Sequence, residues 1–232
     1  MLIVRDLSVG YYRDLLVLRD LNVEARAGIT AILGANGVGK STLLKAVYGF
    51  LRPQKGSIEF NGVDLVGTPP HRMVDAGLSY IPQQSSVFPH MTVEENLRMG
   101  AWTFKRDDRR VEEQLERNYV RFPVLKEKRK QRAGELSGGQ QRMVEIGRGL
   151  MTAPHVFLID EPTAGLAARL TGEVYEMLVA LREEGLIILL VDQEIRSALK
   201  IADYVYVLDL GRNRFEGPPS EFEDLKKAFW SS

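Results

Sequence analysis

Short apolar runs at strand spacing recur along the chain, separated by turn residues and by longer helical patterns. The run at residues 29–33 has mainly aliphatic side chains and ends at a glycine, which is the pattern of a buried strand. The strands that we predict are residues 2–9, 16–25, 29–33, 57–60, 78–81, 156–159, 187–191 and 204–208.

Helical spacing follows several of these strands. Residues 41–51 place four aliphatic side chains on one helical face, and Pro53 ends that pattern. From residue 93 to residue 153 the spacing is helical, and Asp107 is a candidate cap for a helix with an apolar residue at every fourth position. A helix at residues 169–184 lies between two buried strands and predicts a parallel crossover.

These elements together predict one α/β domain over residues 1–232. Its core takes up about residues 1–86 and 154–232, has a mostly parallel sheet, and is interrupted by a helical insertion at about 87–153. Near the end of the chain, Ser220 and Glu223 have the spacing of a capping box and predict a terminal helix.

Composition and charge exclude several kinds of function. Lys+Arg and Asp+Glu are both 31, and this balance disfavours a nucleic-acid partner. The absence of cysteine excludes disulfides, thiolate catalysis and cysteine-based metal sites. The first residues lack the pattern of a signal peptide, and the longest apolar run, 186–191, is far short of the roughly 20 residues that span a bilayer. If the protein works at a membrane, we expect another subunit to hold it there.

A glycine-rich stretch gives the first indication of chemistry. Residues 34–41, GANGVGKS, fit G-x-x-x-x-G-K-[ST] and lie between a predicted strand and a predicted helix. In such a loop, backbone N–H groups and the helix N-terminus face phosphate oxygens; Lys40 neutralises the β- and γ-phosphates and the Ser41 hydroxyl binds Mg²⁺. We expect ATP to be bound by Gly34, Ala35, Asn36, Gly37, Val38, Gly39, Lys40, Ser41 and Thr42. The loop alone does not distinguish kinases, GTPases and ATPases.

Two adjacent acids, Asp160 and Glu161, follow the predicted strand 156–159. An apolar strand that ends in an acid is the expected partner of a phosphate loop. There, Asp160 supports the magnesium ion through its water shell, and Glu161 polarises the attacking water as a general base. Solvated surface charges or helix caps are the alternative interpretation. The phosphate loop favours the catalytic one.

The segment Leu136-Ser-Gly-Gly-Gln140 precedes a helical pattern and predicts a second anion-binding helix start, with a plain glycine turn as the alternative. Lying between GANGVGKST and VFLIDEPT, this LSGGQ segment resembles that of the ATP-binding subunits of ABC transporters, and the resemblance covers nearly the whole chain. It implies a P-loop NTPase (RecA-like) core with a mostly parallel sheet, an N-terminal antiparallel β-subdomain and an inserted α-helical subdomain.

The resemblance also implies a head-to-tail dimer that holds ATP and Mg²⁺ between two chains. The segment that contacts the ATP held by the other subunit would be Ser137, Gly138, Gly139 and Gln140. Tyr12 matches the aromatic residue that stacks on adenine, with Tyr11 as the alternative. Gln83 matches a glutamine that senses magnesium and the γ-phosphate, although the adjacent Gln84 leaves the register open.

Two positions depart from the general pattern of the family. Ala167 stands where an aspartate is usual, and Gln193 stands where a histidine contacts the γ-phosphate. Glutamine keeps hydrogen bonding but cannot carry charge or move a proton. Because Glu161 and Lys40 are intact, we expect an active ATPase. If the role of the usual histidine requires a charged imidazolium, hydrolysis should be slower than in family members that have this histidine.

Three stretches resemble the ATPase subunits of branched-chain amino-acid importers: Gln-Arg-Ala-Gly before the LSGGQ segment, GLMTAPHVFLIDEPTAGLA after it, and VDQ in place of an acid–histidine pair. Some urea and amide importers share this pattern. The resemblance implies an ATP-hydrolysing motor subunit of an ABC import complex, lying at the cytoplasmic face of the membrane. Its implied partners are a second ATPase subunit, identical or sister, a membrane permease contacting about residues 83–99, and indirectly a substrate-binding protein.

Two other functions remain as alternatives. A soluble ABC ATPase acting on nucleic acid or ribosomes is disfavoured by the compact insertion and the balanced charge. A regulatory module that binds ATP without hydrolysing it is suggested by Ala167 and Gln193, but Glu161 argues against it because such a module has no need of a base.

Overall fold

A computed structural model describes residues 1–12 and 14–222. The strands are β1 (Leu2–Val9), β2 (Leu18–Ala25), β3 (Gly28–Leu33), β4 (Lys55–Phe60), β5 (Val63–Asp64), β6 (Leu78–Ile81), β7 (Val156–Asp160), β8 (Ile187–Val191), β9 (Tyr204–Asp209) and β10 (Arg212–Gly217). The helices are α1 (Lys40–Val47), α2 (Pro70–Met73), α3 (Val93–Met99), α4 (Asp108–Arg121), α5 (Pro123–Glu127), α6 (Gly138–Leu150), α7 (Ala168–Glu183) and α8 (Ile195–Ile201), with a 3-10 turn η1 (Ala133–Glu135).

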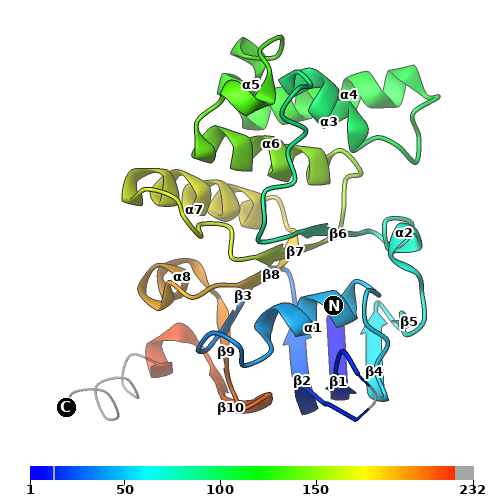
Figure 1. Cartoon of the computed structure of the whole chain (residues 1–232), viewed down its shortest axis with the longest axis vertical. Helices are drawn as coiled ribbons and strands as arrows, with labels where there is room; N and C mark the ends of the chain where they lie inside the picture. Colours follow the sequence, from blue (N-terminus) through cyan, green and yellow to red (C-terminus); the bar gives the residue numbers. More distant parts are fainter. Residues whose placement is uncertain (13, 223–232) are drawn as a thin grey trace.

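Two sheets form the lower part of the molecule (Figure 1). The larger has the order β10-β9-β3-β8-β7-β6 and is parallel from β9 to β6, while β10 joins β9 in antiparallel orientation. The smaller sheet, β2-β1-β4-β5, is antiparallel throughout. The mostly parallel core and the N-terminal antiparallel sheet were both predicted and are confirmed.

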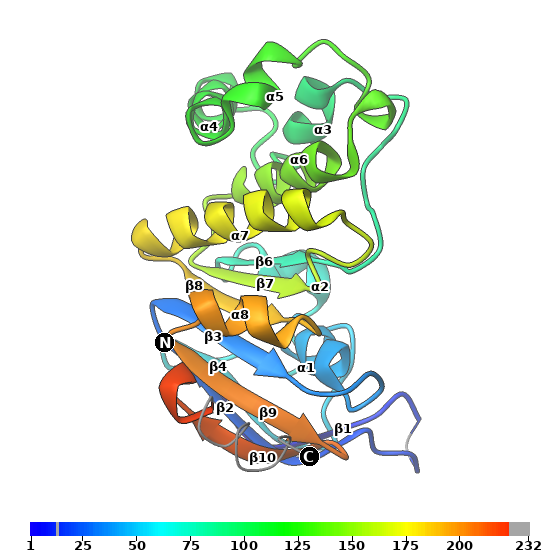
Figure 2. The same ribbon diagram turned by 90° about the vertical axis from the view of Figure 1, so that its left-hand side faces the viewer.

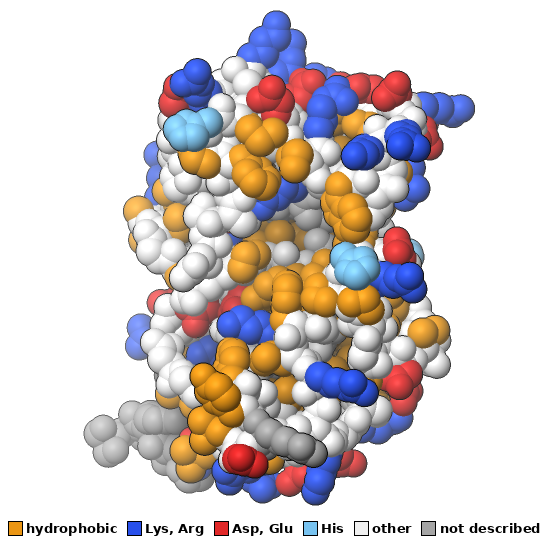
Figure 3. All heavy atoms as spheres, turned by 45° about the vertical axis from the view of Figure 1, so that its right-hand side comes forward, with side chains coloured by type: hydrophobic (Ala, Val, Ile, Leu, Met, Phe, Trp, Pro, Cys, Tyr) orange, Lys and Arg blue, Asp and Glu red, His pale blue; other side chains and the backbone are white. Residues whose placement is uncertain are grey.

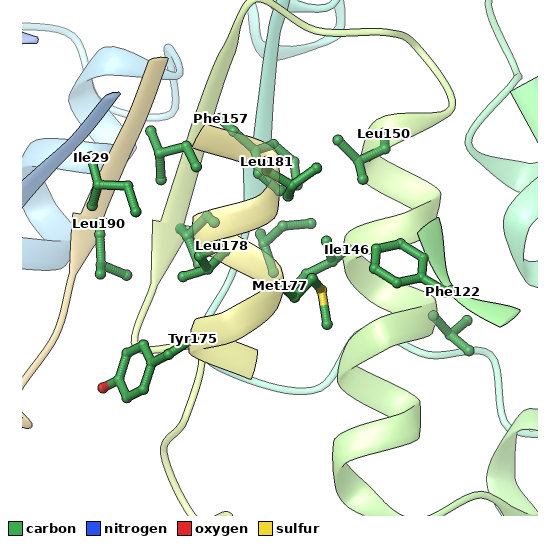
Figure 4. Close-up of a cluster of buried hydrophobic side chains, with 14 of the residues drawn as sticks. Ile29, Phe122, Ile146, Leu150, Phe157, Tyr175, Met177, Leu178, Leu181 and Leu190 are labelled. Atoms are coloured by element: carbon green, nitrogen blue, oxygen red, sulfur yellow. The ribbon is translucent and has the colours of Figure 1, made fainter. Parts of the chain in front are cut away.

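The central strands are buried on both faces. Along β3, the side chains of Ile29, Ala31 and Leu33 join one hydrophobic cluster and that of Ile32 joins the other, as the two-residue period of a strand requires. The first cluster continues into α6 and α7, and Figure 4 shows Leu178 of α7 and Ile146 of α6 within it. The second cluster packs the opposite face against α1 and the antiparallel sheet.

Helices α3 to α6 gather at one end of the molecule, beyond α7, which lies over the sheet (Figure 2). The side chain of Asp107 caps α4 by accepting a hydrogen bond from the N–H of Arg110, as predicted. The crossover helix α7 and the strand pairing of β7 with β8 in parallel are also confirmed.

Several predicted boundaries were wrong. The first helix ends at Val47 instead of residue 51, because Gly49 adopts a φ of 81° and a Cβ there would lie 2.4 Å from the carbonyl oxygen of Thr68. The second strand begins at Leu18 instead of residue 16, and β4 begins at Lys55. The predicted capping pair at the end of the chain lies partly outside the described residues, since these stop at residue 222.

Candidate nucleotide-binding site

The glycine-rich loop connects β3 to α1 at the carboxyl edge of the parallel sheet, where ligands of such sheets bind. Gly39 precedes the helix with a φ of 108°, and a Cβ on it would lie 2.4 Å from Leu18 Cδ2, so only glycine fits. No side chain caps α1. Its first N–H groups therefore remain free to bind an anion.

The side chain of Lys40 is buried and folds back over this loop. Its Nζ donates hydrogen bonds to the carbonyl oxygens of Gly34 (2.9 Å) and Ala35 (3.1 Å), and lies 4.0 Å from Glu161 Oε1. Burial lowers the pKa of Lys40, while the nearby carboxylates of Glu161 and Asp160 act in the opposite direction. The ammonium group is thus fixed beside the loop and close to the acidic cluster.

Asp160 is the last residue of β7, and its side chain faces the phosphate loop. Its Oδ1 accepts a hydrogen bond from Ser41 Oγ (2.9 Å), and its Oδ2 accepts one from the hydroxyl of Tyr80 (3.3 Å). Burial raises the pKa of Asp160, and these two hydrogen bonds oppose that effect. A carboxylate beside a hydroxyl is an oxygen donor set that suits Mg²⁺.

The described residues contain no cluster of three or more His, Cys, Asp or Glu side chains that holds a metal by itself. Mg²⁺ usually keeps several waters and binds through one or two carboxylates together with phosphate oxygens. The pair formed by Ser41 and Asp160 fits that mode of binding.

Glu161 is held in an unusual backbone conformation. Its φ is 44°, which is uncommon for a residue other than glycine, and its N–H donates to the carbonyl oxygen of Val191 (2.8 Å). The carboxylate Oε2 accepts hydrogen bonds from the side-chain amides of Gln83 (2.6 Å) and Gln193 (3.1 Å). Burial raises the pKa of Glu161 from that of an ordinary glutamate. The arrangement orients a carboxylate whose proton affinity is raised toward that of a general base.

Three strand ends supply the side chains of this cluster. Gln83 follows β6, Glu161 follows β7 and Gln193 follows β8. Gln193, which stands where the family usually has a histidine, therefore lies within hydrogen-bond distance of the predicted base, Glu161. Gln83, and not Gln84, points into the cluster and lines the adjacent cavity.

Two residues near the site had been given no role from the sequence. Asp192 is buried and accepts hydrogen bonds from the N–H groups of Gln193 (2.8 Å) and Glu194 (2.9 Å), and from the hydroxyl of Tyr175 (2.9 Å). Asp192 thereby fixes the backbone that presents Gln193. The acid at the end of β8 was the available signal for this role, but Tyr175 lies on α7 and no sequence pattern connects it to the site.

A cavity of about 400 Å³ lies over these groups. It is lined by Tyr11, Val17, Asn36, Gly37, Gly39, Lys40, Ser41, Thr42, Gln83, Glu161 and Gln193. Tyr11 is the aromatic residue of this lining, and its hydroxyl accepts a hydrogen bond from Lys45 Nζ (3.2 Å). Tyr12 lies outside the lining and is 73% exposed. The choice of Tyr12 as the adenine-stacking residue stays a prediction.

The segment that begins α6 lies apart from this cavity. Ser137 is the N-cap of α6 and forms a capping box with Gln140, in which each residue's N–H donates to the other's side-chain oxygen. Ser137 and Gly138 are exposed, and none of the four residues from Ser137 to Gln140 lines the cavity, although the structure describes them all. The predicted helix start is confirmed, and within one chain it does not reach the phosphate loop's cavity.

Comparison with known proteins agrees with this site. The chain is 43% identical over 203 residues to the high-affinity branched-chain amino acid transport ATP-binding protein BraG of Pseudomonas aeruginosa, covering 87% of this chain and 86% of the relative. It is 36% identical over 223 residues to the probable branched-chain amino acid transport ATP-binding protein LivF of Archaeoglobus fulgidus, covering 95% and 93%.

A solved structure shows the same fold. The chain superposes with a TM-score of 0.85 and 29% identity on cbiO1 from Clostridium perfringens, which is part of an ABC transporter complex. The match covers 99% of this chain and 93% of cbiO1. The family model for ABC transporters matches residues 18–164, which include the phosphate loop, the LSGGQ segment and the two acids. The chain therefore belongs to the ABC transporter family as one of its ATP-binding, ATP-hydrolysing cassettes.

Proposed function

We propose that this protein is the ATP-hydrolysing motor subunit of an import complex for branched-chain or other amino acids. The observation that carries the hydrolytic part is the Glu161 carboxylate, which accepts from two amides and lies 4.0 Å from the ammonium of Lys40. The transport part rests on the relatives, two of which are transport ATP-binding proteins for branched-chain amino acids.

In the proposed reaction, the free N–H groups of the loop bind the β- and γ-phosphates of ATP. Lys40 exchanges its hydrogen bonds to loop carbonyls for phosphate oxygens, since a charged acceptor binds an ammonium group more strongly than a carbonyl does. Ser41 and Asp160 would hold Mg²⁺, with Gln83 as the third candidate contact from the chain. When bound, this ion neutralises phosphate charge.

Glu161 then acts on the attacking water. Its carboxylate takes a proton from that water as the water approaches the γ-phosphate, and burial makes this transfer easier by raising the pKa of Glu161. Gln83 and Gln193 hold the carboxylate in place from two sides. Gln193 thus substitutes for the usual histidine as a neutral positioning group that contributes no charge.

The second half of the site comes from another chain in this proposal. Ser137 and the following glycines present an exposed helix N-terminus, which favours an anion, and within their own chain they lie outside the cavity. A head-to-tail dimer brings this segment to the γ-phosphate held by the partner's loop. Closure on ATP and reopening after hydrolysis then supply the movement that drives transport.

The permease contact is proposed at about residues 83–99. Several large hydrophobic side chains are exposed on or near this stretch, including Phe88, Met99 and Trp102. Hydrophobic side chains gather around a hollow between the helical end and the core (Figure 3). None of the helices among the described residues has the length and apolar character that crossing a bilayer requires. On the basis of the similar transport proteins, we propose that the protein binds permease subunits at the cytoplasmic face of the membrane, with the helical insertion at about 87–153 as the coupling part.

The test is ATP hydrolysis and amino-acid uptake by the complete complex reconstituted in vesicles. We expect Mg²⁺-dependent hydrolysis that drives uptake, and neither in a complex with Glu161→Gln, which keeps the shape of the side chain but removes the base. Hydrolysis no faster than in this variant contradicts the motor function. Hydrolysis without uptake of any branched-chain amino acid contradicts the proposed substrate class.

A further inference from the structure

Helix α6, which begins at the LSGGQ segment, carries a buried ion pair one turn further along. Arg142 and Glu145 are 6% and 2% exposed, and Arg142 Nη1 lies 2.8 Å from Glu145 Oε2. A buried ion pair is costly to desolvate and is maintained only where further hydrogen bonds satisfy both partners. The surroundings of this pair show which hydrogen bonds those are.

The guanidinium of Arg142 uses all five of its N–H donors. Besides Glu145, it donates to four backbone carbonyl oxygens: Pro82 (3.0 Å), Gln83 (3.2 Å), Glu161 (3.3 Å) and Pro162 (2.9 Å). These carbonyls belong to the segments that follow β6 and β7. One side chain of α6 is therefore bonded to the backbone of both Gln83 and Glu161, whose side chains are themselves joined by the 2.6 Å hydrogen bond.

Glu145 connects the same helix to the next part of that loop. Its Oε1 accepts hydrogen bonds from Ser85 Oγ (2.8 Å) and from the N–H of Ser86 (2.6 Å). The pair thus ties α6 to residues 82–86 and 161–162 through six hydrogen bonds.

We propose that Arg142, held by Glu145, is a positioning residue that sets Gln83 and Glu161 for hydrolysis according to where the LSGGQ segment lies. Arg142 follows Ser137 by little more than one helical turn, so a displacement of the helix start moves the guanidinium with it. The guanidinium carries that displacement to the backbone of both site residues. The proposal deepens the proposed ATPase function and rests on it.

A lysine cannot replace Arg142 in this role. An ammonium has three donors on a flexible stem, whereas the five partners here are arranged around a planar fork. Arg142→Lys therefore keeps the charge that balances Glu145 but loses the simultaneous contact with both segments. This variant separates positioning from charge.

The experiment compares the wild-type full chain with Arg142→Lys and with the double variant Arg142→Gln/Glu145→Gln, which leaves no buried unpaired charge and so protects folding. The matched control is Arg121→Gln/Glu184→Gln, which removes an Arg–Glu pair that joins α4 to the end of α7, away from the cavity. Hydrolysis rates and ATP affinity are measured separately. In both test variants we expect kcat to fall about tenfold or more while the Kd for ATP changes less than about threefold, since orientation and not binding is lost.

A second readout does not depend on activity. We expect amide hydrogen exchange to accelerate in residues 83–86 and at Glu161 and Thr163 in the double variant, with α1 unchanged and the control pair like the wild type. A kcat within about twofold of the wild type, or an equal loss in the control pair, overturns the proposal. If the wild type itself does not hydrolyse ATP, the proposed function fails, and unchanged exchange in these segments then overturns the positioning role.

Discussion

The two parts of the molecule that carry the ATPase motifs are built very differently. At the sheet edge, Lys40, Asp160 and Glu161 are buried and their side chains are hydrogen-bonded within the chain. At the start of α6, Ser137 and Gly138 are exposed, and the capping box with Gln140 satisfies only the helix end. The first region is fixed by contacts within its own chain, whereas the second is an exposed helix N-terminus.

In the proposed composite site, this difference divides the work between the two regions. The sheet edge supplies strain and burial, seen in the positive φ of Glu161 and in the raised pKa of both acids. Such features cost stability and persist only where surrounding structure fixes them. The start of α6 needs no strained backbone or buried charge, because its proposed role is to present an exposed helix N-terminus to a second chain. The following predictions test this comparison from the largest expected effect to the smallest.

Lys40→Ala is expected to have the largest effect. It removes the cation beside the loop, and the affinity for ATP should fall about 100-fold or more, because hydrogen bonds from a charged donor to phosphate are lost. Titration calorimetry measures the affinity. Lys126→Ala, at an exposed lysine paired with Glu116, is the control and should bind ATP like the wild type. Equal affinity in the Lys40 variant would show that the loop does not bind phosphates as described.

Ser137→Arg should act on turnover and not on binding. A large cation at the exposed helix start blocks close approach of a second chain, while the cavity of the same chain keeps all its lining residues. We expect wild-type ATP affinity with hydrolysis as low as in Glu161→Gln. Ser137→Asn, which keeps a good N-cap, controls for loss of the helix cap. Undiminished turnover in Ser137→Arg would remove the helix start from the mechanism.

The pH dependence of hydrolysis should report on Glu161. Because burial raises its pKa, the ionised base is lost as pH falls through a value above that of an ordinary glutamate, so the acid limb of kcat lies there. The Gln83 amide favours the charged form, and Gln83→Ala should therefore move this limb to higher pH. Gln84→Ala is the control and should leave the limb in place. A limb that moves to lower pH in Gln83→Ala contradicts the assignment of the base.

Ala167→Asp should have the smallest effect. Ala167 is the N-cap of α7 and offers no side-chain hydrogen bond. An aspartate there caps the helix and should raise the free energy of unfolding by about 0.5–1 kcal/mol. Thermal or urea unfolding measures this gain, with Ala167→Leu as a control that cannot cap. No gain over Ala167→Leu would mean that the backbone at residue 167 does not allow capping.

The sequence predicted those parts of the molecule whose chemistry is local. The phosphate loop, the acids at the end of β7 and the capped start of α6 each depend on neighbouring residues, and their elements are confirmed. The strand β10 was missed because its residues alternate without a clear apolar face. The end of α1 was misjudged because the conformation of Gly49 depends on contact with residue 68, which lies far along the chain.

Contacts between distant segments escaped prediction at the site as well. Nothing in the sequence shows that Tyr175 supports Asp192, or that Arg142 contacts four carbonyls on two other segments. The hydrogen bond from Gln193 to Glu161 was also not foreseen, although Gln193 itself was recognised as a departure. Each of these contacts joins strand ends and helices that only the folded sheet brings together.

The most direct test of the composite site is to mix two inactive chains. Lys40→Ala has a defective loop but an intact helix start, and Ser137→Arg has the opposite combination. In a head-to-tail dimer of the two, one site combines the intact loop of one chain with the intact helix start of the other. We predict that the mixture hydrolyses ATP although neither variant does so alone. A mixture no more active than the sum of its separate components would contradict the account.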